Sequence, residues 1–194
     1  LWSGLGYYSR ARNLHRCAKQ VVAQWGGEFP RAVADLQALP GIGRSTAAAI
    51  ASLCFGAREA ILDANVKRVL TRVLGFEADL SVAANERALW HLAEEVLPRD
   101  DLARTMPRYT QGMMDIGALL CTPRSPSCLV CPAEPLCEAR QAGRPEDFPR
   151  RTRKLKRSVQ SIWLLWARNG GQAWLQKRPV PGVWAGLYCL PWFD

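Results

Sequence analysis

The sequence predicts a mainly α-helical domain followed by the start of a smaller α+β domain. Through most of the first 120 residues, apolar residues recur at three- and four-residue spacing, the period of amphipathic helices. After residue 158 the apolar residues alternate or form short runs around Asn169-Gly170-Gly171, which is typical of a β-hairpin. We therefore expect a helical domain over 1–139, a linker over 140–157 and a partial second domain over 158–194.

Composition indicates a folded protein with a polyanionic partner. Of the 194 residues 48% are hydrophobic, which is enough for a substantial core. Lysine and arginine total 26 against 17 acidic residues, and the net charge of +9 favours a partner such as nucleic acid. The sequence has no run of eighteen apolar residues and no charged-then-apolar leader. We expect no membrane association and a cytoplasmic location.

Helical spacing of apolar residues predicts a series of helices in the first domain, each bounded by a turn. The first ends at Gly26-Gly27, and the third is rich in alanine. The fourth has an apolar side formed by Val66, Val69, Leu70 and Val73. In order, the expected helices cover residues 9–25, 31–38, 44–55, 62–74, 83–97 and 102–120.

The stretch from Leu39 to Ala48, LPGIGRSTAA, matches a helix-hairpin-helix motif. We expect Gly41 and Gly43 to allow backbone conformations that are closed to other residues. Peptide N–H groups at the start of the next helix then point outward at a phosphate, and Arg44 adds positive charge there. Such a contact positions the protein on DNA without reading its sequence. An ordinary interhelical turn remains the alternative, because Pro-Gly pairs are common in turns.

Cysteines at 121, 128, 131 and 137 follow the spacing C-x6-C-x2-C-x5-C within one proline-rich loop. Thiolates so close in sequence can enclose a metal centre, and soft sulfur ligands favour an iron–sulfur cluster or zinc. Structural zinc sites usually show two short C-x2-C pairs, and only one is present. The spacing therefore favours a [4Fe–4S] cluster, with zinc, or inert or disulfide-bonded cysteines, as alternatives.

Basic residues dominate the segment that follows the cysteines. Residues 140–157 carry eight arginines or lysines against Glu146 and Asp147, together with two prolines. This composition is typical of a solvated linker, which adds salt-sensitive affinity for DNA if it touches the backbone. After it we expect strands over 159–166 and 172–178.

Three features occur in one order: the hairpin, the run Ile61–Leu70 (ILDANVKRVL) and the cysteine loop. This arrangement resembles the endonuclease III superfamily of DNA glycosylases, which implies a helix-hairpin-helix glycosylase fold with an iron–sulfur loop. The resemblance implies that Asp63 is catalytic and stabilises the positive charge of the deoxyribose. Asp63 also suits a helix N-cap, and both roles can hold together.

Other matches narrow the resemblance to adenine DNA glycosylases of the MutY type. Residues 1–14 resemble the segment with a wedge tyrosine, which implies that Tyr7 enters the base stack beside the lesion. Asn65 matches the residue that holds the catalytic aspartate, while Gln111 and Ser45 match residues that line the adenine pocket. Arg124, within the cysteine loop, is expected to meet the DNA backbone.

The position after Gly41-Ile42-Gly43-Arg44 distinguishes two chemistries in the superfamily. Enzymes that also cut the strand carry a lysine there, and this sequence has Ser45, which cannot form a Schiff base. The resemblance therefore implies a monofunctional enzyme that removes adenine opposite 8-oxoguanine or guanine. Lys67, one helical turn after Asp63, is close enough in sequence to reach an opened sugar, although a solvated helix face suits it better.

The ends of the sequence suggest a fragment. It begins with Leu1-Trp2, and residues 176–191 resemble only the beginning of the Nudix-like domain that recognises 8-oxoguanine in MutY-type proteins. The family's general acid, a glutamate, precedes the wedge-tyrosine segment, so we expect this chain alone to bind DNA weakly, as a monomer, and to be inactive. The remaining alternatives are an endonuclease III-like pyrimidine glycosylase and a noncatalytic DNA-binding module.

Overall fold

The computed structural model describes Trp2, residues 5–152 and residues 159–193. The chain divides into two compact units. We call residues 9–154 the helical unit and residues 1–8 with 155–194 the strand unit. The last part of the expected linker, 153–157, and the expected domain start at residue 158 lie outside the described residues.

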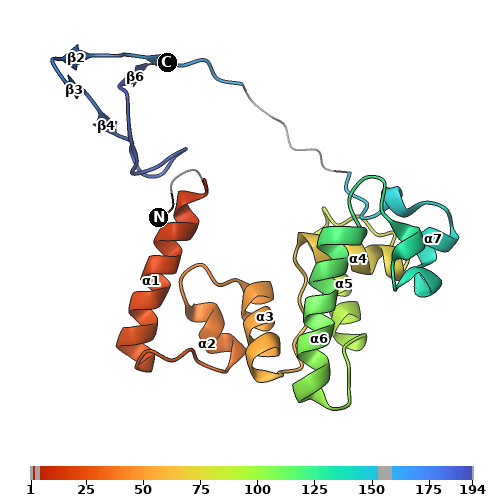
Figure 1. Cartoon of the computed structure of the whole chain (residues 1–194). Helices are drawn as coiled ribbons and strands as arrows, with labels where there is room; N and C mark the ends of the chain where they lie inside the picture. The colour runs from red at the N-terminus through yellow and green to blue at the C-terminus, as the bar shows by residue number, and fades with distance from the viewer. Residues whose placement is uncertain (1, 3–4, 153–158, 194) are drawn as a thin grey trace. The chain divides into compact units, whose positions relative to one another are not determined.

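Helices of the helical unit begin and end close to the expected positions (Figure 1), and the prediction of a mainly helical fold is confirmed. The last expected helix differs, because it is α-helical only to Asp115 and continues as a π-helical turn, η1 (Ile116–Leu120). The α-helices before it are α1 (Tyr8–Trp25), α2 (Val33–Ala38), α3 (Arg44–Phe55), α4 (Ala64–Val73), α5 (Ala83–Glu95) and α6 (Leu102–Asp115).

Two apolar cores lie on opposite sides of α3, whose small side chains allow neighbours to approach closely. Ala47 and Ala51 belong to the core formed with α1 and α2. Ala48 belongs to the larger core formed with α4, α5 and α6. That larger core contains the buried residues Ala60, Ile61, Leu62, Val66, Leu70, Leu80, Leu89, Ala93, Leu97 and Met106. Its packing fixes the segment that leads into α4.

Contacts along α3 and α6 show that these helices run antiparallel. Gly56, at the end of α3, lies against Ala103 near the start of α6, where an added Cβ would be 2.8 Å from the Ala103 Cα. Earlier in α3, the Ser52 hydroxyl lies 2.6 Å from the Thr110 hydroxyl, with both residues fully buried. The start of α3 therefore lies level with the C-terminal part of α6.

Much of the expected linker is folded onto the helical unit. Short helical turns α7 (Glu138–Gln141) and η4 (Pro145–Asp147) follow the cysteine loop, which contains the 3₁₀ turns η2 (Cys128–Val130) and η3 (Glu134–Leu136). Phe148 is buried, and the backbone N–H of Leu80 donates to the Arg150 carbonyl. Residues 140–152 thus contact other parts of the helical unit at particular positions, although most of their side chains are exposed.

The strand unit consists of antiparallel pairs of two-residue strands. β1 (Trp163–Leu164) pairs with β6 (Trp192–Phe193), and β4 (Gln176–Lys177) with β5 (Tyr188–Cys189). β2 (Arg168–Asn169) pairs with β3 (Gln172–Ala173), with Asn169 opposite Gln172. The expected hairpin around Gly170-Gly171 is therefore confirmed, although the paired segments are shorter than the expected strands.

Candidate active site and cysteine loop

The hairpin turn needs glycine at one of its two glycine positions. Gly41 has φ +82°, and a Cβ added there would lie 2.7 Å from the Asn13 Cβ of α1. Gly43 has φ −86° and ψ 174°, an extended conformation open to any residue, and an added Cβ would meet nothing within 4 Å. The expected special conformation therefore exists at Gly41 only, and Gly43 instead leaves the start of α3 uncovered.

The start of α3 offers backbone donors to an anion. Gly43 occupies the N-cap and has no side chain that can accept from the first-turn N–H groups. Arg44 stands at the expected place, but its guanidinium lies on α5. One nitrogen is 2.9 Å from a Glu94 oxygen, and the Cζ lies 3.8 Å from the centroid of the Trp90 ring. The Arg44 charge is therefore already paired with Glu94, although about half of the side chain remains exposed.

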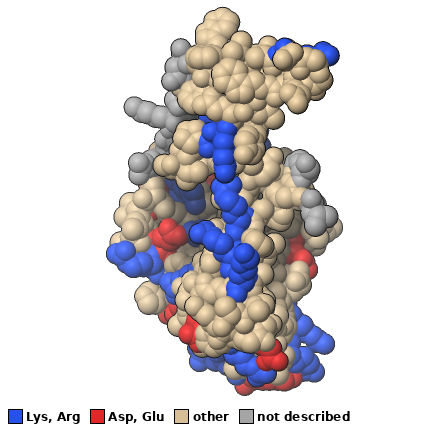
Figure 2. Space-filling model, turned by 90° about the vertical axis from the view of Figure 1, so that its left-hand side faces the viewer, with Lys and Arg blue, Asp and Glu red and all other residues tan. Residues whose placement is uncertain are grey.

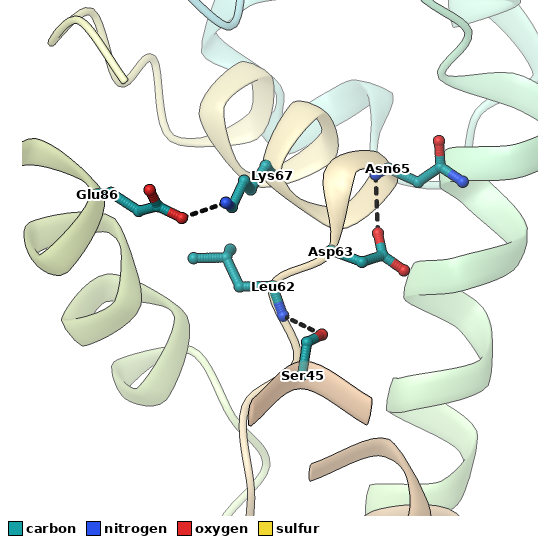
Figure 3. A network of polar contacts seen from close by, with 6 residues as sticks. All are labelled: Ser45, Leu62, Asp63, Asn65, Lys67 and Glu86. Atoms are coloured by element: carbon teal, nitrogen blue, oxygen red, sulfur yellow. Dashed lines mark hydrogen bonds and ion pairs between the residues drawn. The ribbon is translucent and has the colours of Figure 1, made fainter. Parts of the chain in front are cut away.

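Ser45 joins the hairpin to the segment before α4. Its hydroxyl oxygen accepts a hydrogen bond from the Leu62 backbone N–H at 3.0 Å (Figure 3). Because Leu62 is buried in the larger core, this bond fixes the next residue, Asp63, beside the first turn of α3.

Asp63 is the N-cap of α4, as its sequence context suggested. Its Oδ1 accepts from the backbone N–H groups of Asn65 (2.7 Å) and Val66 (2.9 Å). The side chain is exposed, and in Figure 3 it points away from Lys67 and toward the ribbon of α6. Among the described residues no hydrogen bond to its second oxygen, Oδ2, is found. The carboxylate is therefore oriented by the helix and still open to a ligand.

Asn65 contacts Asp63 through its backbone, while its side chain serves another neighbour. The Asn65 Oδ1 accepts from the Arg68 guanidinium at 3.0 Å. Arg68 is buried and also donates to the carbonyl oxygens of Gly117 and Cys121, both at 2.6 Å. A Cβ added to Gly117 would lie 2.9 Å from the Asn65 Cβ. Arg68 thus ties the first turn of α4 to the beginning of the cysteine loop.

Lys67 faces away from Asp63. Its ammonium group forms an ion pair with Glu86 of α5 (Figure 3), and its side chain is 17% exposed. The idea that Lys67 attacks an opened sugar would require this pair to break.

Gln111 lies on the exposed side of α6. Its Nε2 donates to the Asp115 Oδ1 at 2.8 Å, one helical turn later. Gln111 follows Thr110, which lies level with Ser52 of α3, and Asp115 lies one turn closer to the level of Ser45. Tyr7 belongs to the strand unit, is 76% exposed and has a φ of +45°.

The loop cysteines converge on one small cavity of about 20 Å³, lined by Cys121, Cys128, Cys131 and Cys137. Burial raises the pKa of the Cys137 thiol, a backbone hydrogen bond from Arg140 lowers it, and the charges of the three other cysteines raise it again. Across residues 5–152 and 159–193, no group of three or more His, Cys, Asp or Glu side chains already has the geometry of a metal site. The shared cavity and its four soft donors nevertheless fit the expected cluster.

Arg72 connects α4 to this loop and is almost fully buried, at 1% exposure. Its guanidinium donates to the carbonyl oxygens of Thr122 (2.7 Å), Pro123 (3.1 Å) and Phe148 (3.3 Å), and to the Cys121 sulfur at 3.3 Å. The buried Arg72 guanidinium therefore donates mainly to backbone carbonyl oxygens of the loop and of the segment after it.

Arg124 is exposed on the same loop, where its carbonyl accepts from the Thr122 hydroxyl at 2.9 Å. The expected contact of Arg124 with a phosphate backbone stays a prediction.

Sequence reasoning missed Arg68, Arg72, Gly117 and Asp115. A signal existed for the two arginines, since they stand four residues apart between apolar positions of one helix. Such spacing puts two charges on one helix face beside a buried one. No comparable signal marked Gly117, because its role depends on the approach of a distant helix.

In the view of Figure 2, lysines and arginines form a row, and acidic residues lie mostly at its margins. α1 carries exposed arginines at positions 10, 12 and 16 and an exposed Lys19, and its sequence contains no acidic residue.

In the described part of the chain no helix combines the length and apolar character that a bilayer crossing requires.

Comparison with known proteins shows what the chain is similar to. Residues 26–53 match the model of the helix-hairpin-helix motif. The whole chain is 38% identical to an adenine DNA glycosylase of Buchnera aphidicola subsp. Schizaphis graminum and covers 55% of that protein. Over 142 residues, 73% of the chain, it is 48% identical to the human adenine DNA glycosylase, of which it covers 25%. The chain thus spans about half or less of the length of these relatives.

The structure also resembles an endonuclease III solved in a non-covalent complex with DNA. The match has a TM-score of 0.54 and 30% identity, and it covers 72% of this chain and 61% of the other. The chain is therefore a homologue of the adenine DNA glycosylases, and its helical part has the fold of the helix-hairpin-helix DNA glycosylases.

Proposed function

We propose that the protein carrying this chain is an adenine DNA glycosylase of base-excision repair. It hydrolyses the N-glycosidic bond of adenine that stands opposite 8-oxoguanine or guanine. The observation that carries this proposal is the exposed Asp63 carboxylate, fixed by two backbone N–H groups at the start of α4. The specificity for adenine is inferred from the relatives named above, which are adenine DNA glycosylases.

Asp63 stabilises the positive charge that develops on deoxyribose as the base leaves. The cap holds Oδ1, so the carboxylate needs no reorganisation, and its second oxygen remains available to the sugar. Preorganised groups of this kind typically contribute a factor of about 100 to 1000 in rate. Asn65 keeps the aspartate in place through its N–H group, and Arg68 keeps Asn65 in place.

The reaction is hydrolysis without strand cutting. Ser45 occupies the position of the lyase lysine, and its hydroxyl is engaged by the Leu62 N–H group. The Lys67 amine is held by Glu86 on the other side of α4. Neither position therefore presents an amine to the sugar carbon that Asp63 faces, which supports a monofunctional enzyme.

DNA is held by contacts to its backbone. The N–H groups at Gly43 and the start of α3, Arg44 and the exposed Arg124 suit phosphate oxygens. Adenine must leave the base stack to reach Asp63. Tyr7 then fills the gap in the duplex, and Gln111 with Ser45 lines the pocket for the extruded base.

The cysteines at 121, 128, 131 and 137 would hold a [4Fe–4S] cluster, which would supply a structural crosslink for the loop that carries Arg124. Arg72 supports the same loop from α4. The strand unit, with residues 158–194 as its main part, would begin the domain that recognises 8-oxoguanine.

The test uses the full-length protein and a duplex with adenine opposite 8-oxoguanine. We expect single-turnover excision, with strand breaks appearing only after alkali. Asp63→Asn should lower the rate about 1000-fold, while duplex binding and thermal stability stay near those of the wild type because asparagine also caps helices. Survival of activity in this variant would leave only a noncatalytic DNA-binding role for the site.

Two further measurements separate the alternatives. Excision of oxidised thymine in preference to adenine would identify a pyrimidine glycosylase of the endonuclease III kind. The 194-residue chain alone should bind DNA weakly and excise adenine at a negligible rate, because the general-acid glutamate is expected upstream of it. Measurable excision by the chain alone would contradict that assignment.

A further inference from the structure

Asp115 contacts the residue expected to read the extruded base. The two side chains lie one turn apart on α6, and the Gln111 Nε2 is 2.8 Å from the Asp115 Oδ1. Both residues are exposed, and Asp115 lies two positions before Gly117, which packs against Asn65. No role follows for Asp115 from the catalytic steps described above.

The chemistry of this pair fixes which way the glutamine amide faces. An ionised carboxylate only accepts hydrogen bonds, so Gln111 must present its NH₂ group to Asp115. Its carbonyl oxygen, Oε1, is then directed away from Asp115. One of the two NH₂ hydrogens is used by Asp115, and the other stays available beside Oε1. Without a neighbour that only accepts, the amide could turn over at little cost.

We infer that Asp115 is a positioning residue that sets the Gln111 amide to accept from a purine amino group, so that the pocket selects adenine over purines with a carbonyl at C6. This inference rests on the proposed function. Adenine offers the N6 amino donor next to the N7 acceptor, which matches a glutamine presenting oxygen and nitrogen together. A purine with O6 would place that acceptor against the Oε1 acceptor and lose the hydrogen bond.

The experiment compares two target bases in the full-length protein. Single-turnover rates are measured on duplexes with adenine or hypoxanthine opposite 8-oxoguanine, because hypoxanthine carries a carbonyl at C6. Asp115→Asn keeps the size of the side chain but can both donate and accept, so Gln111 can then turn over. We expect the ratio of the adenine rate to the hypoxanthine rate to fall about tenfold. Asp115→Glu retains an acceptor and should retain most of the ratio.

Controls separate positioning from stability and from the proposed function. Asp100→Asn, an exposed aspartate just before α6, removes the same charge and should leave the ratio unchanged. In a Gln111→Leu background, Asp115→Asn should have no further effect on the ratio. The inference is overturned if Asp115→Asn slows both substrates equally or leaves the ratio intact while Gln111→Leu lowers it. Failure of the wild type to excise adenine would instead reject the proposed function.

Discussion

The two ends of α4 are held by different kinds of contact. At its N-terminus the Asp63 carboxylate accepts from N–H groups two and three residues later, and it remains exposed. Near its C-terminus Arg72 is buried and donates to the Thr122 carbonyl, 50 positions away. One end is therefore organised by sequence neighbours and the other by tertiary contacts.

This difference shows how one short helix can serve two tasks. A reacting group must be open to its ligand, and a helix N-cap orients a carboxylate without burying it. A loop without regular structure needs partners for its carbonyl oxygens, and a buried arginine supplies several donors at once. Arg68 lies between the two ends and contacts both Asn65 and Cys121.

The strongest test of the buried end is Arg72→Met. Removing the guanidinium leaves the carbonyls of Thr122, Pro123 and Phe148 without their donor, and we expect a loss of about 3 kcal/mol in unfolding free energy. Urea unfolding should show this loss of stability, and the ratio of iron to protein should fall with it. The same change at Arg108, an exposed arginine of α6, should alter neither. Equal effects of the two substitutions would contradict a special role for Arg72.

Arg68→Met tests whether the two ends are connected. The Asn65 side chain and the carbonyls of Gly117 and Cys121 lose a donor, which should cost about 2 kcal/mol. The rate of adenine excision should fall together with stability because Asn65 loses its support. Arg87→Met, on an exposed position of α5, is the matched control. An unchanged rate would mean that the contact of Asn65 with Asp63 is independent of Arg68.

The cap at the exposed end is tested by two substitutions of one residue. Asp63→Ala removes the acceptor of two N–H groups and should lower the free energy of unfolding by about 1 kcal/mol. Asp63→Asn should cost less, because asparagine caps equally well. Chemical unfolding of both variants at neutral pH gives the comparison. If alanine were as stable as asparagine, the cap would have no role in holding α4.

A smaller effect is expected where Arg44 lies on α5. Glu94→Gln should release the guanidinium for a phosphate and tighten binding to undamaged duplex about twofold to fivefold, since both partners are about half exposed. Glu95→Gln makes the same charge change one residue later and controls for it. Fluorescence anisotropy at several salt concentrations measures both. Equal affinities for the two variants would show that Glu94 does not compete with DNA.

The smallest effect concerns Asp79, which holds the end of the folded linker. Hydrogen bonds from Ser81 and Thr152 keep the pKa of its carboxyl far below the ordinary 3.8. A depressed pKa means that the stabilisation is complete above about pH 3.8 and is lost as pH falls further toward the folded-state pKa. Carboxyl NMR should show the low midpoint, and Asp79→Asn should speed amide exchange at Thr152. A midpoint at the ordinary value would contradict these bonds.

Particular residues show how far the sequence could predict the site. Asp63, Ser45 and the hairpin could be placed because each lies at a helix start, where local spacing determines geometry. The Arg44–Glu94 pair could not be predicted, because it depends on where α5 packs against α3. The turn of the Asn65 side chain toward Arg68 likewise depends on the approach of Gly117.

By itself the sequence determined the helices of this protein, the hairpin and the set of four cysteines, since helical periods, turn residues and ligand spacing are properties of neighbouring residues. Tertiary structure alone decided that residues 140–152 belong to the helical unit and that Arg72 supports the cysteine loop. It also decided that one arginine joins Asn65 to Cys121. The physical reason is that a buried polar group takes whichever acceptors the packed chain brings near it, and those acceptors are far away in sequence.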